Sequence, residues 1–254
     1  MLKESWSIHH QNFRNLKQPK QPKRPKPPTP ARRQLKRALV FGATGLTGHH
    51  LTEQLLANKN YREIICVNRH PMGLNHERLT EVIDDYSNLQ SLKVMPPIDE
   101  VFCCIGTTIK KAGSKENFKK VDLELPVAIA KLAADKKAGK LLVVSSIGAK
   151  AGSGNFYLRT KGEMEKEVLR IEGPLKTIVR PSMLLGERNE KRSAESIGQW
   201  LMKPLKIFMI GKLRKYRPIP ATDVARAMIA IANSQPTTQV IFESNDLQEI
   251  ANGG

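Results

Sequence analysis

The fold of this chain is decided by the stretch Leu39-Val40-Phe41-Gly42-Ala43-Thr44-Gly45-Leu46-Thr47-Gly48, in which an apolar strand runs directly into three glycines spaced three apart. The following residues, up to Leu56, place leucines on one face of a helix. A strand, a sharp glycine turn and a helix in this order are typical of a dinucleotide-binding unit. There the first glycine makes the turn, the second lets a pyrophosphate approach the backbone, and the third lets the helix pack on its strand. The alternative is a tight strand-to-helix turn that binds nothing.

Apolar strands alternate with amphipathic helices over the rest of the chain. Strands are expected at 64–67, 79–83, 101–108, 141–144 and 177–180, and helices at 122–137 and 156–171. We expect residues 110–121 to form a basic loop. This alternation predicts an α/β fold, a doubly wound parallel sheet of the Rossmann type.

The pattern loosens after Pro181. A polar loop at 187–192, a helix at 196–201, a helix at 224–232 and a late strand at 240–242 are expected. We interpret residues 182–254 as a small C-terminal region that covers the substrate, within one NAD(P)-binding domain of residues 36–254.

Residues 1–35 differ in composition from the rest. Six prolines lie between positions 19 and 30, and residues 1–37 carry eleven Lys or Arg against the single acid Glu4. Such a segment cannot bury enough apolar surface to offset its ordering entropy, so we expect a disordered, basic, Pro-rich tail that is dispensable for folding. A tail that contacts polyanions non-specifically, by charge alone, is an alternative. A further alternative is an organelle-targeting segment. The tail has neither the apolar run nor the Ser/Arg-rich amphipathic helix that would support it.

The charge, the apolar runs and the cysteines indicate where the protein is located and which partners it lacks. The 254 residues carry a formal net charge of +18, much of it in the tail. The sequence has no apolar run of the roughly 18 residues needed to span a membrane, so no membrane contact is expected. Cys66, Cys103 and Cys104 lie in apolar runs without metal-ligand spacing, so we expect reduced, buried thiols, no metal site and a cytoplasmic location. The oligomeric state is not predicted.

The end of the second strand discriminates between the two nicotinamide cofactors. An acid at this point holds the ribose hydroxyls of NAD, whereas a basic residue accommodates the 2′-phosphate of NADP. The sequence reads Asn68-Arg69-His70 here, and guanidinium binds phosphate well. NADP(H) is therefore favoured, and an ordinary surface arginine is the alternative. Asp84 ends the third strand, where it would lie beside the adenine, and Gly106 ends the fourth, where it would let the cofactor pass close by.

Tyr157 and Lys161 are four residues apart, so they share one face of the expected helix. An ammonium close to a phenol favours the phenolate, which suits a tyrosine that acts as general acid or base on a carbonyl or alcohol. Ser146 ends the strand before this helix and can lie beside the phenol. The spacing alone is weak evidence, and its value comes from its position after the fifth strand of a dinucleotide-binding sheet.

These motifs together resemble the short-chain dehydrogenase/reductase superfamily. More closely, Phe102-Cys103-Cys104-Ile105-Gly106-Thr107-Thr108, Tyr157-x-x-x-Lys161-Gly162-Glu163 and Arg180-Pro181 resemble the atypical NAD(P)H-binding oxidoreductases related to the Tat-interactive protein. The likeness covers about residues 37–251. It departs from the superfamily at Cys103–Gly106, where an Asn-containing motif is usual, so a proton relay through that Asn is not implied.

The resemblance implies a role for each matching residue. Tyr157 would donate the proton, Lys161 would hold the nicotinamide ribose and tune Tyr157, and Ser146 would bind the substrate oxygen, with Ser145 as the alternative. The cofactor would be held by Gly42, Thr44, Gly45, Leu46, Thr47, Gly48, Arg69, Asp84, Gly106, Thr107, Tyr157, Lys161 and Leu184.

The preferred function is an NADPH-dependent oxidoreductase that acts on an unidentified small carbonyl or alcohol. The main alternative is a non-catalytic NADP(H)-binding regulatory protein. A sugar-nucleotide epimerase would need a larger C-terminal domain than the roughly seventy residues after Pro181. A hydrolase is disfavoured because all six histidines precede the fifth strand and the sequence has no Gly-x-Ser-x-Gly elbow.

Overall fold

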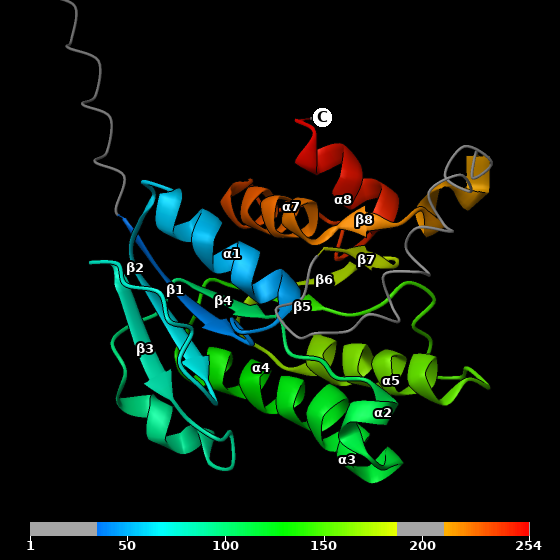
Figure 1. Ribbon diagram of the computed structural model, residues 1–254, viewed down its shortest axis with the longest axis horizontal. Coiled ribbons are helices and arrows are strands. Elements are labelled where there is room, and N and C mark those ends of the chain that lie inside the picture. The colour runs from blue at the N-terminus through cyan, green and yellow to red at the C-terminus, as the bar shows by residue number, and fades with distance from the viewer. Residues whose placement is uncertain (1–34, 187–210, 254) are drawn as a thin grey trace, which may run out of the picture. The chain divides into compact units, whose positions relative to one another are not determined.

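The computed structural model describes residues 35–186 and 211–253. Seven parallel strands form one sheet in the order β3-β2-β1-β4-β5-β6-β9 (Figure 1). They are β1 (Lys36–Phe41), β2 (Tyr61–Asn68), β3 (Leu79–Ile83), β4 (Glu100–Cys103), β5 (Lys140–Val144), β6 (Leu175–Arg180) and β9 (Ile241–Glu243). The strand order reverses between β1 and β4, which pair with each other. The predicted doubly wound parallel sheet is confirmed.

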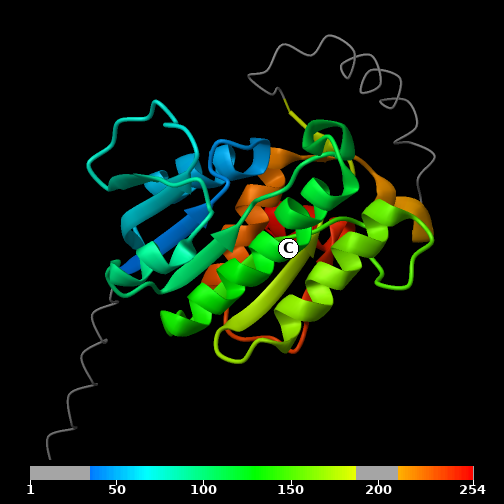
Figure 2. The same ribbon diagram turned by 90° about the horizontal axis from the view of Figure 1, so that it is seen from below.

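Helices cover both faces of this sheet (Figures 1 and 2). One face packs against α1 (Leu46–Ala57), α7 (Ala221–Asn233) and α8 (Ser244–Ala251), and the other against α4 (Leu125–Asp135) and α5 (Phe156–Arg170). Because both faces are buried, successive residues of β1 belong to opposite cores: Val40 packs with Leu51, and Phe41 with Ile129. This is why the central strands are apolar throughout.

The segment expected to be a basic loop instead contains helical turns, so that expectation was wrong. Helices α2 (Ile109–Ala112) and α3 (Lys115–Lys119) occupy it. The hydroxyls of Thr108 and Ser114 cap their first turns by accepting hydrogen bonds from the backbone N–H groups of Lys111 and Asn117. A π-helical turn, Lys120–Glu124, then leads into α4. The sequence signal for these two helices was the presence of a hydroxyl residue, Thr108 or Ser114, at each N-cap position.

The C-terminal region contributes α7, β9, α8 and a small parallel pair of strands, β7 (Leu184–Leu185) and β8 (Ile219–Pro220). Helix α8 was not predicted, although Glu243 and Asp246 form a capping box at its start. The tail at 1–34, the polar loop at 187–192 and the helix at 196–201 lie outside the described residues. The substrate-covering role of 182–254 stays a prediction.

A cluster of polar side chains lies at the edge of the sheet where the strands begin, opposite the edge formed by their carboxyl ends. Glu100, at the start of β4, is only 3% exposed and contacts Lys36 Nζ and Tyr61 Oη at 2.5 Å each. Asn233 at the end of α7 donates a hydrogen bond to Tyr61 Oη at 3.0 Å. Burial, and then the Glu100 charge, raise the pKa of Tyr61. This cluster anchors the end of α7 across the strand starts.

Candidate functional site

The glycine turn lies at the carboxyl end of β1. Gly42 has φ +79°, and a Cβ there would lie 2.9 Å from the carbonyl carbon of Cys104, just after the neighbouring strand β4. Gly45 is the N-cap residue of α1, and Gly48 lies in the first turn of that helix against the Gly42 carbonyl. The backbone therefore bends between two strand ends where side chains do not fit. The first turn of α1 is left open to an anion.

The other predicted phosphate residues surround this turn. Thr44 is exposed, Leu46 is half-buried, and Thr47 is buried. Leu46 packs against Gly186: its Cδ1 would lie 2.9 Å from a Cβ at that position. The chain just after Leu184 therefore lies against the glycine turn, although Leu184 is distant in sequence.

The predicted adenine end gathers at the carboxyl ends of β2 and β3. Arg69 is exposed, and the Asp84 backbone N–H donates to the Asn68 carbonyl at 2.9 Å. Tyr86 packs on Phe41, with ring centroids 6.3 Å apart, and its hydroxyl donates to the Val67 carbonyl at 2.8 Å. Burial raises the pKa of Tyr86 to about 12, and the charge of Arg69 opposes this rise. Tyr86 was not predicted, because only the fold brings it beside the glycine turn.

Lys161 is buried, with a side chain 4% exposed, and its Nζ lies 2.7 Å from Asp122 Oδ1. Asp122 is fully buried in the π-helical turn, and its Oδ2 accepts the backbone N–H of Thr107 at 2.8 Å. A Cβ at Gly106 would lie 3.4 Å from Asp122 Oδ1 and 3.7 Å from Lys161 Nζ. Gly106, Thr107 and Lys161, predicted separately, are thus brought together. Asp122, which joins them, was missed.

Tyr157 lies one turn before Lys161 on α5, a helix capped by the Asn155 side chain. Its ring is half-buried against Phe118 of α3, with centroids 5.7 Å apart. Tyr157 and Lys161 are close enough that the phenol contributes to the charge environment of the ammonium. The helical spacing read from the sequence therefore gives the expected juxtaposition.

The two candidate serines at the end of β5 differ in environment. Ser145 is buried, and its hydroxyl donates to Glu165 Oε1 at 2.5 Å. Glu165 also binds Arg180 through two hydrogen bonds, from Nε at 2.9 Å and from Nη2 at 2.5 Å. Ser146 is half-buried, and among the described residues its hydroxyl has only a long contact, 3.4 Å, to the Ile147 carbonyl. Ser145 is therefore committed to the interior, and Ser146 is the better placed to bind a ligand.

The residues at the carboxyl edge fit a dinucleotide. Within the described part of the chain, three buried side-chain oxygens have no hydrogen-bond partner: Thr47 Oγ1, Asn68 Oδ1 and Asp122 Oδ1. Asp122 Oδ1 faces the Lys161 ammonium, which leaves Thr47 Oγ1 and Asn68 Oδ1 without any partner in that part. A buried polar atom without a partner is costly, and a bound ligand with hydroxyl and phosphate groups would satisfy both. Asn68 occupies the strand-end position next to Arg69, and it joins the predicted set as a missed candidate.

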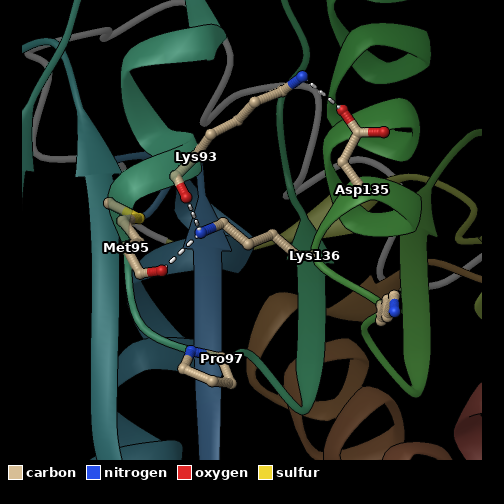
Figure 3. Close-up of a pocket in the computed structure, with 6 residues that line it drawn as sticks. Lys93, Met95, Pro97, Asp135 and Lys136 are labelled. Carbon is tan, nitrogen blue, oxygen red and sulfur yellow. Dashed lines mark hydrogen bonds and ion pairs between the residues drawn. The ribbon is translucent and has the colours of Figure 1, made fainter.

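A hollow of about 460 Å³ lies elsewhere, between the 3-10 helix Leu89–Val94 and the end of α4 (Figure 3). Two of its three lysines are already engaged: Lys136 Nζ donates to the carbonyls of Lys93 and Met95, and Lys93 Nζ pairs with Asp135 at 3.0 Å (Figure 3). The end of α4 lies at the edge where strands begin, away from the glycine turn. We assign this hollow no function.

The described part of the chain meets the requirements of neither a metal site nor a membrane-spanning helix, and its cysteines are free thiols. It contains no cluster of His, Cys, Asp or Glu suited to a metal ion, and none of its helices has the length and apolar character to cross a bilayer. Cys66 and Cys103 are buried free thiols and Cys104 is half-buried. Burial raises the pKa of Cys66 to about 12 and that of Cys103 to about 11.

A family model described as NAD(P)H-binding matches residues 42–235. The chain belongs to this NAD(P)H-binding family, and the resemblance read from its motifs is confirmed. It is 30% identical over 213 residues to protein FMP52, mitochondrial, of Eremothecium gossypii, covering 83% of this chain and 95% of that protein. It is 28% identical over 202 residues to protein HTATIP2 of Rattus norvegicus, covering 78% of this chain and 81% of that protein. A nicotinamide cofactor follows from the family, without a choice between NAD and NADP.

Solved structures with this fold include MoeE5 in complex with UDP-glucose and NAD, at a TM-score of 0.63 and 17% identity, covering 85% of this chain and 81% of that one. Another is the ADP-L-glycero-D-manno-heptose-6-epimerase of Helicobacter pylori, at a TM-score of 0.64 and 15% identity, covering 89% of this chain and 84% of that one. At such identities they show the fold alone.

The expected cytoplasmic location was wrong. The FMP52 relatives of Eremothecium gossypii, Candida albicans and Lodderomyces elongisporus are all named as mitochondrial proteins. Their names point to mitochondria. Free thiols favour a reducing compartment but do not distinguish one such compartment from another, so the cysteines could not indicate the cytoplasm.

Proposed function

We propose that this protein is an NADPH-dependent reductase of a small carbonyl compound, with Tyr157 as the proton donor. The observation that carries the proposal is the buried Lys161 ammonium, one helical turn from Tyr157 and close to Gly106 at the carboxyl edge of the sheet. In open α/β sheets ligands bind at this edge, where the strand order reverses. The family supports a nicotinamide cofactor.

Each residue has a role in this proposal. When bound, NADPH would supply the hydride to the carbonyl carbon. Tyr157 would give its hydroxyl proton to the carbonyl oxygen, so that a carbonyl becomes an alcohol with no charge left on the oxygen. The Lys161 ammonium would stabilise the phenolate that remains and hold the nicotinamide ribose. Ser146 would donate a hydrogen bond to the same substrate oxygen.

The choice of NADP(H) rests on Arg69, which is exposed beside Asn68 and affects the charge environment of Tyr86. Replacing Arg69 by Glu should weaken NADPH binding by about 1.5–3 kcal/mol, the contribution of a charge-assisted contact, and leave NADH binding little changed. Fluorescence titration with both reduced cofactors measures this. Arg62→Glu is the matched control, because Arg62 is an exposed arginine at the other end of β2. Tighter binding of NADH than NADPH by the wild type would contradict the assignment.

The assignment of Ser146 over Ser145 has its own test. Ser146→Ala should lower turnover at an unchanged melting temperature. Ser145→Ala should instead cost about 1.5–3 kcal/mol of folding stability, because it removes a buried hydrogen bond to the Glu165 carboxylate. Thermal melting and NADPH oxidation on both variants separate the two serines. If Ser145→Ala lost turnover at full stability, the assignment would be reversed.

A further inference from the structure

Asp122 lies where the helical backbone is irregular, and the sequence explains why. Pro126 follows four residues later, and a proline has no N–H to donate to the carbonyl of residue i−4, with which its ring also clashes. The α-helical ladder is therefore interrupted at the Asp122 carbonyl. The turn Lys120–Glu124 is π-helical instead, and the Leu125 N–H bonds the Lys120 carbonyl five residues back. Single π turns of this kind are frequent at functional sites.

The Asp122 carboxylate holds two groups of the candidate site at once. One oxygen accepts the Thr107 N–H, which fixes the backbone just beyond β4. The other forms an ion pair with the Lys161 ammonium at 2.7 Å. With side-chain exposures of 0% and 4%, neither member of the pair has water to replace the other. Loss of one charge would leave the other buried and unpaired.

Three titratable groups face the Lys161 ammonium: Asp122 from the π-helical turn, Tyr157 from its own helix and Cys103 from β4. Burial alone would disfavour the charged amine. The Asp122 charge and, to a lesser degree, Tyr157 outweigh that penalty, so the pKa of Lys161 is raised above its ordinary value. The Cys103 thiol is buried and its own pKa is raised, so it is neutral at physiological pH.

We infer that Asp122 is a positioning residue of the cofactor site, which keeps Lys161 charged and fixed beside Gly106 so that its ammonium meets the nicotinamide ribose. The inference rests on the proposed function only in assigning Lys161 to that ribose. Asp122 touches neither cofactor nor substrate in this role. It acts through Lys161 and through the Thr107 backbone.

The test is the pH dependence of NADPH affinity in Asp122→Asn, measured by fluorescence titration from pH 7 to 10. Wild type should bind with constant affinity over this range, because Lys161 stays charged. In Asp122→Asn no negative charge offsets the effect of burial on the Lys161 ammonium. Lys161 should therefore lose its proton between pH 7 and 10, and the affinity for NADPH should fall on the order of tenfold by pH 10. Glu124→Gln is the matched control, since Glu124 is an exposed acid on the same turn, and it should behave as wild type.

A purely structural role for Asp122 would weaken binding by the same factor at every pH, and that result would overturn the inference. The double variant Asp122→Asn/Lys161→Met covers the case in which the single variant does not fold. Removing both charges should give a protein that folds even where Asp122→Asn does not, or that melts at a higher temperature than Asp122→Asn where both fold, and failure to do so would also overturn the inference. None of these readouts needs turnover, so they stand even if Tyr157 proves not to be a proton donor.

Discussion

Tyr157→Phe is expected to bind NADPH as tightly as wild type and to turn over about 10²-fold more slowly or worse, the usual contribution of a positioned general acid. The substitution removes one oxygen and leaves the ring contact with Phe118 in place. Folding and the cofactor cradle should therefore be preserved. What is lost is the proton that the carbonyl oxygen needs as hydride arrives.

The measurement is NADPH oxidation over a panel of aldehydes, ketones and quinones, with wild type and Tyr157→Phe side by side. Tyr216→Phe is the matched control, because Tyr216 is 45% exposed at the end of the 3-10 helix Gly211–Tyr216. Equal turnover by wild type and Tyr157→Phe on every active substrate would rule out Tyr157 as the acid. If none of the proteins oxidised NADPH, the regulatory alternative, a protein that binds NADP(H) without turnover, would be preferred.

The parts of the site that the sequence predicted are those defined by short-range spacing. The glycine turn occupies seven consecutive positions, and Tyr157 and Lys161 are one helical turn apart, so local geometry decides both. The parallel pairing of the strands follows from alternation, because parallel strands need helical crossovers. Hence β3 was predicted with its observed limits, and α1 and α5 to within one residue.

The parts that were missed depend on contacts between distant residues. Asp122 lies 39 positions before Lys161, and nothing in the sequence pairs them. The signal for the π turn, Pro126 four residues after Asp122, was present but is not specific. The sequence left Ser145 and Ser146 as alternatives, and the contact of Ser145 with Glu165, twenty residues away on α5, distinguishes them.

Gly48→Ala is expected to destabilise the protein and to remove NADPH binding, the reverse of the usual effect of this substitution in a helix. Alanine normally stabilises a helical position by about 0.5–1 kcal/mol relative to glycine. Here the added Cβ would collide with the Gly42 carbonyl oxygen and lie 3.0 Å from the Ala43 Cα.

The colliding atoms are backbone at the end of β1, so the strain cannot be relieved by a side-chain rotation. Helix α1 must move away from its strand, which moves the amide groups of its first turn away from the phosphate position. Overpacking of this kind costs about 1–3 kcal/mol, and a domain of this size loses roughly 2–4 °C in melting temperature per kcal/mol. Gly152→Ala is the control, because no atom lies within 4 Å of a Cβ there. If Gly48→Ala melted at or above the wild-type temperature and still bound NADPH, the close approach of α1 to the turn would not be what builds the cofactor site.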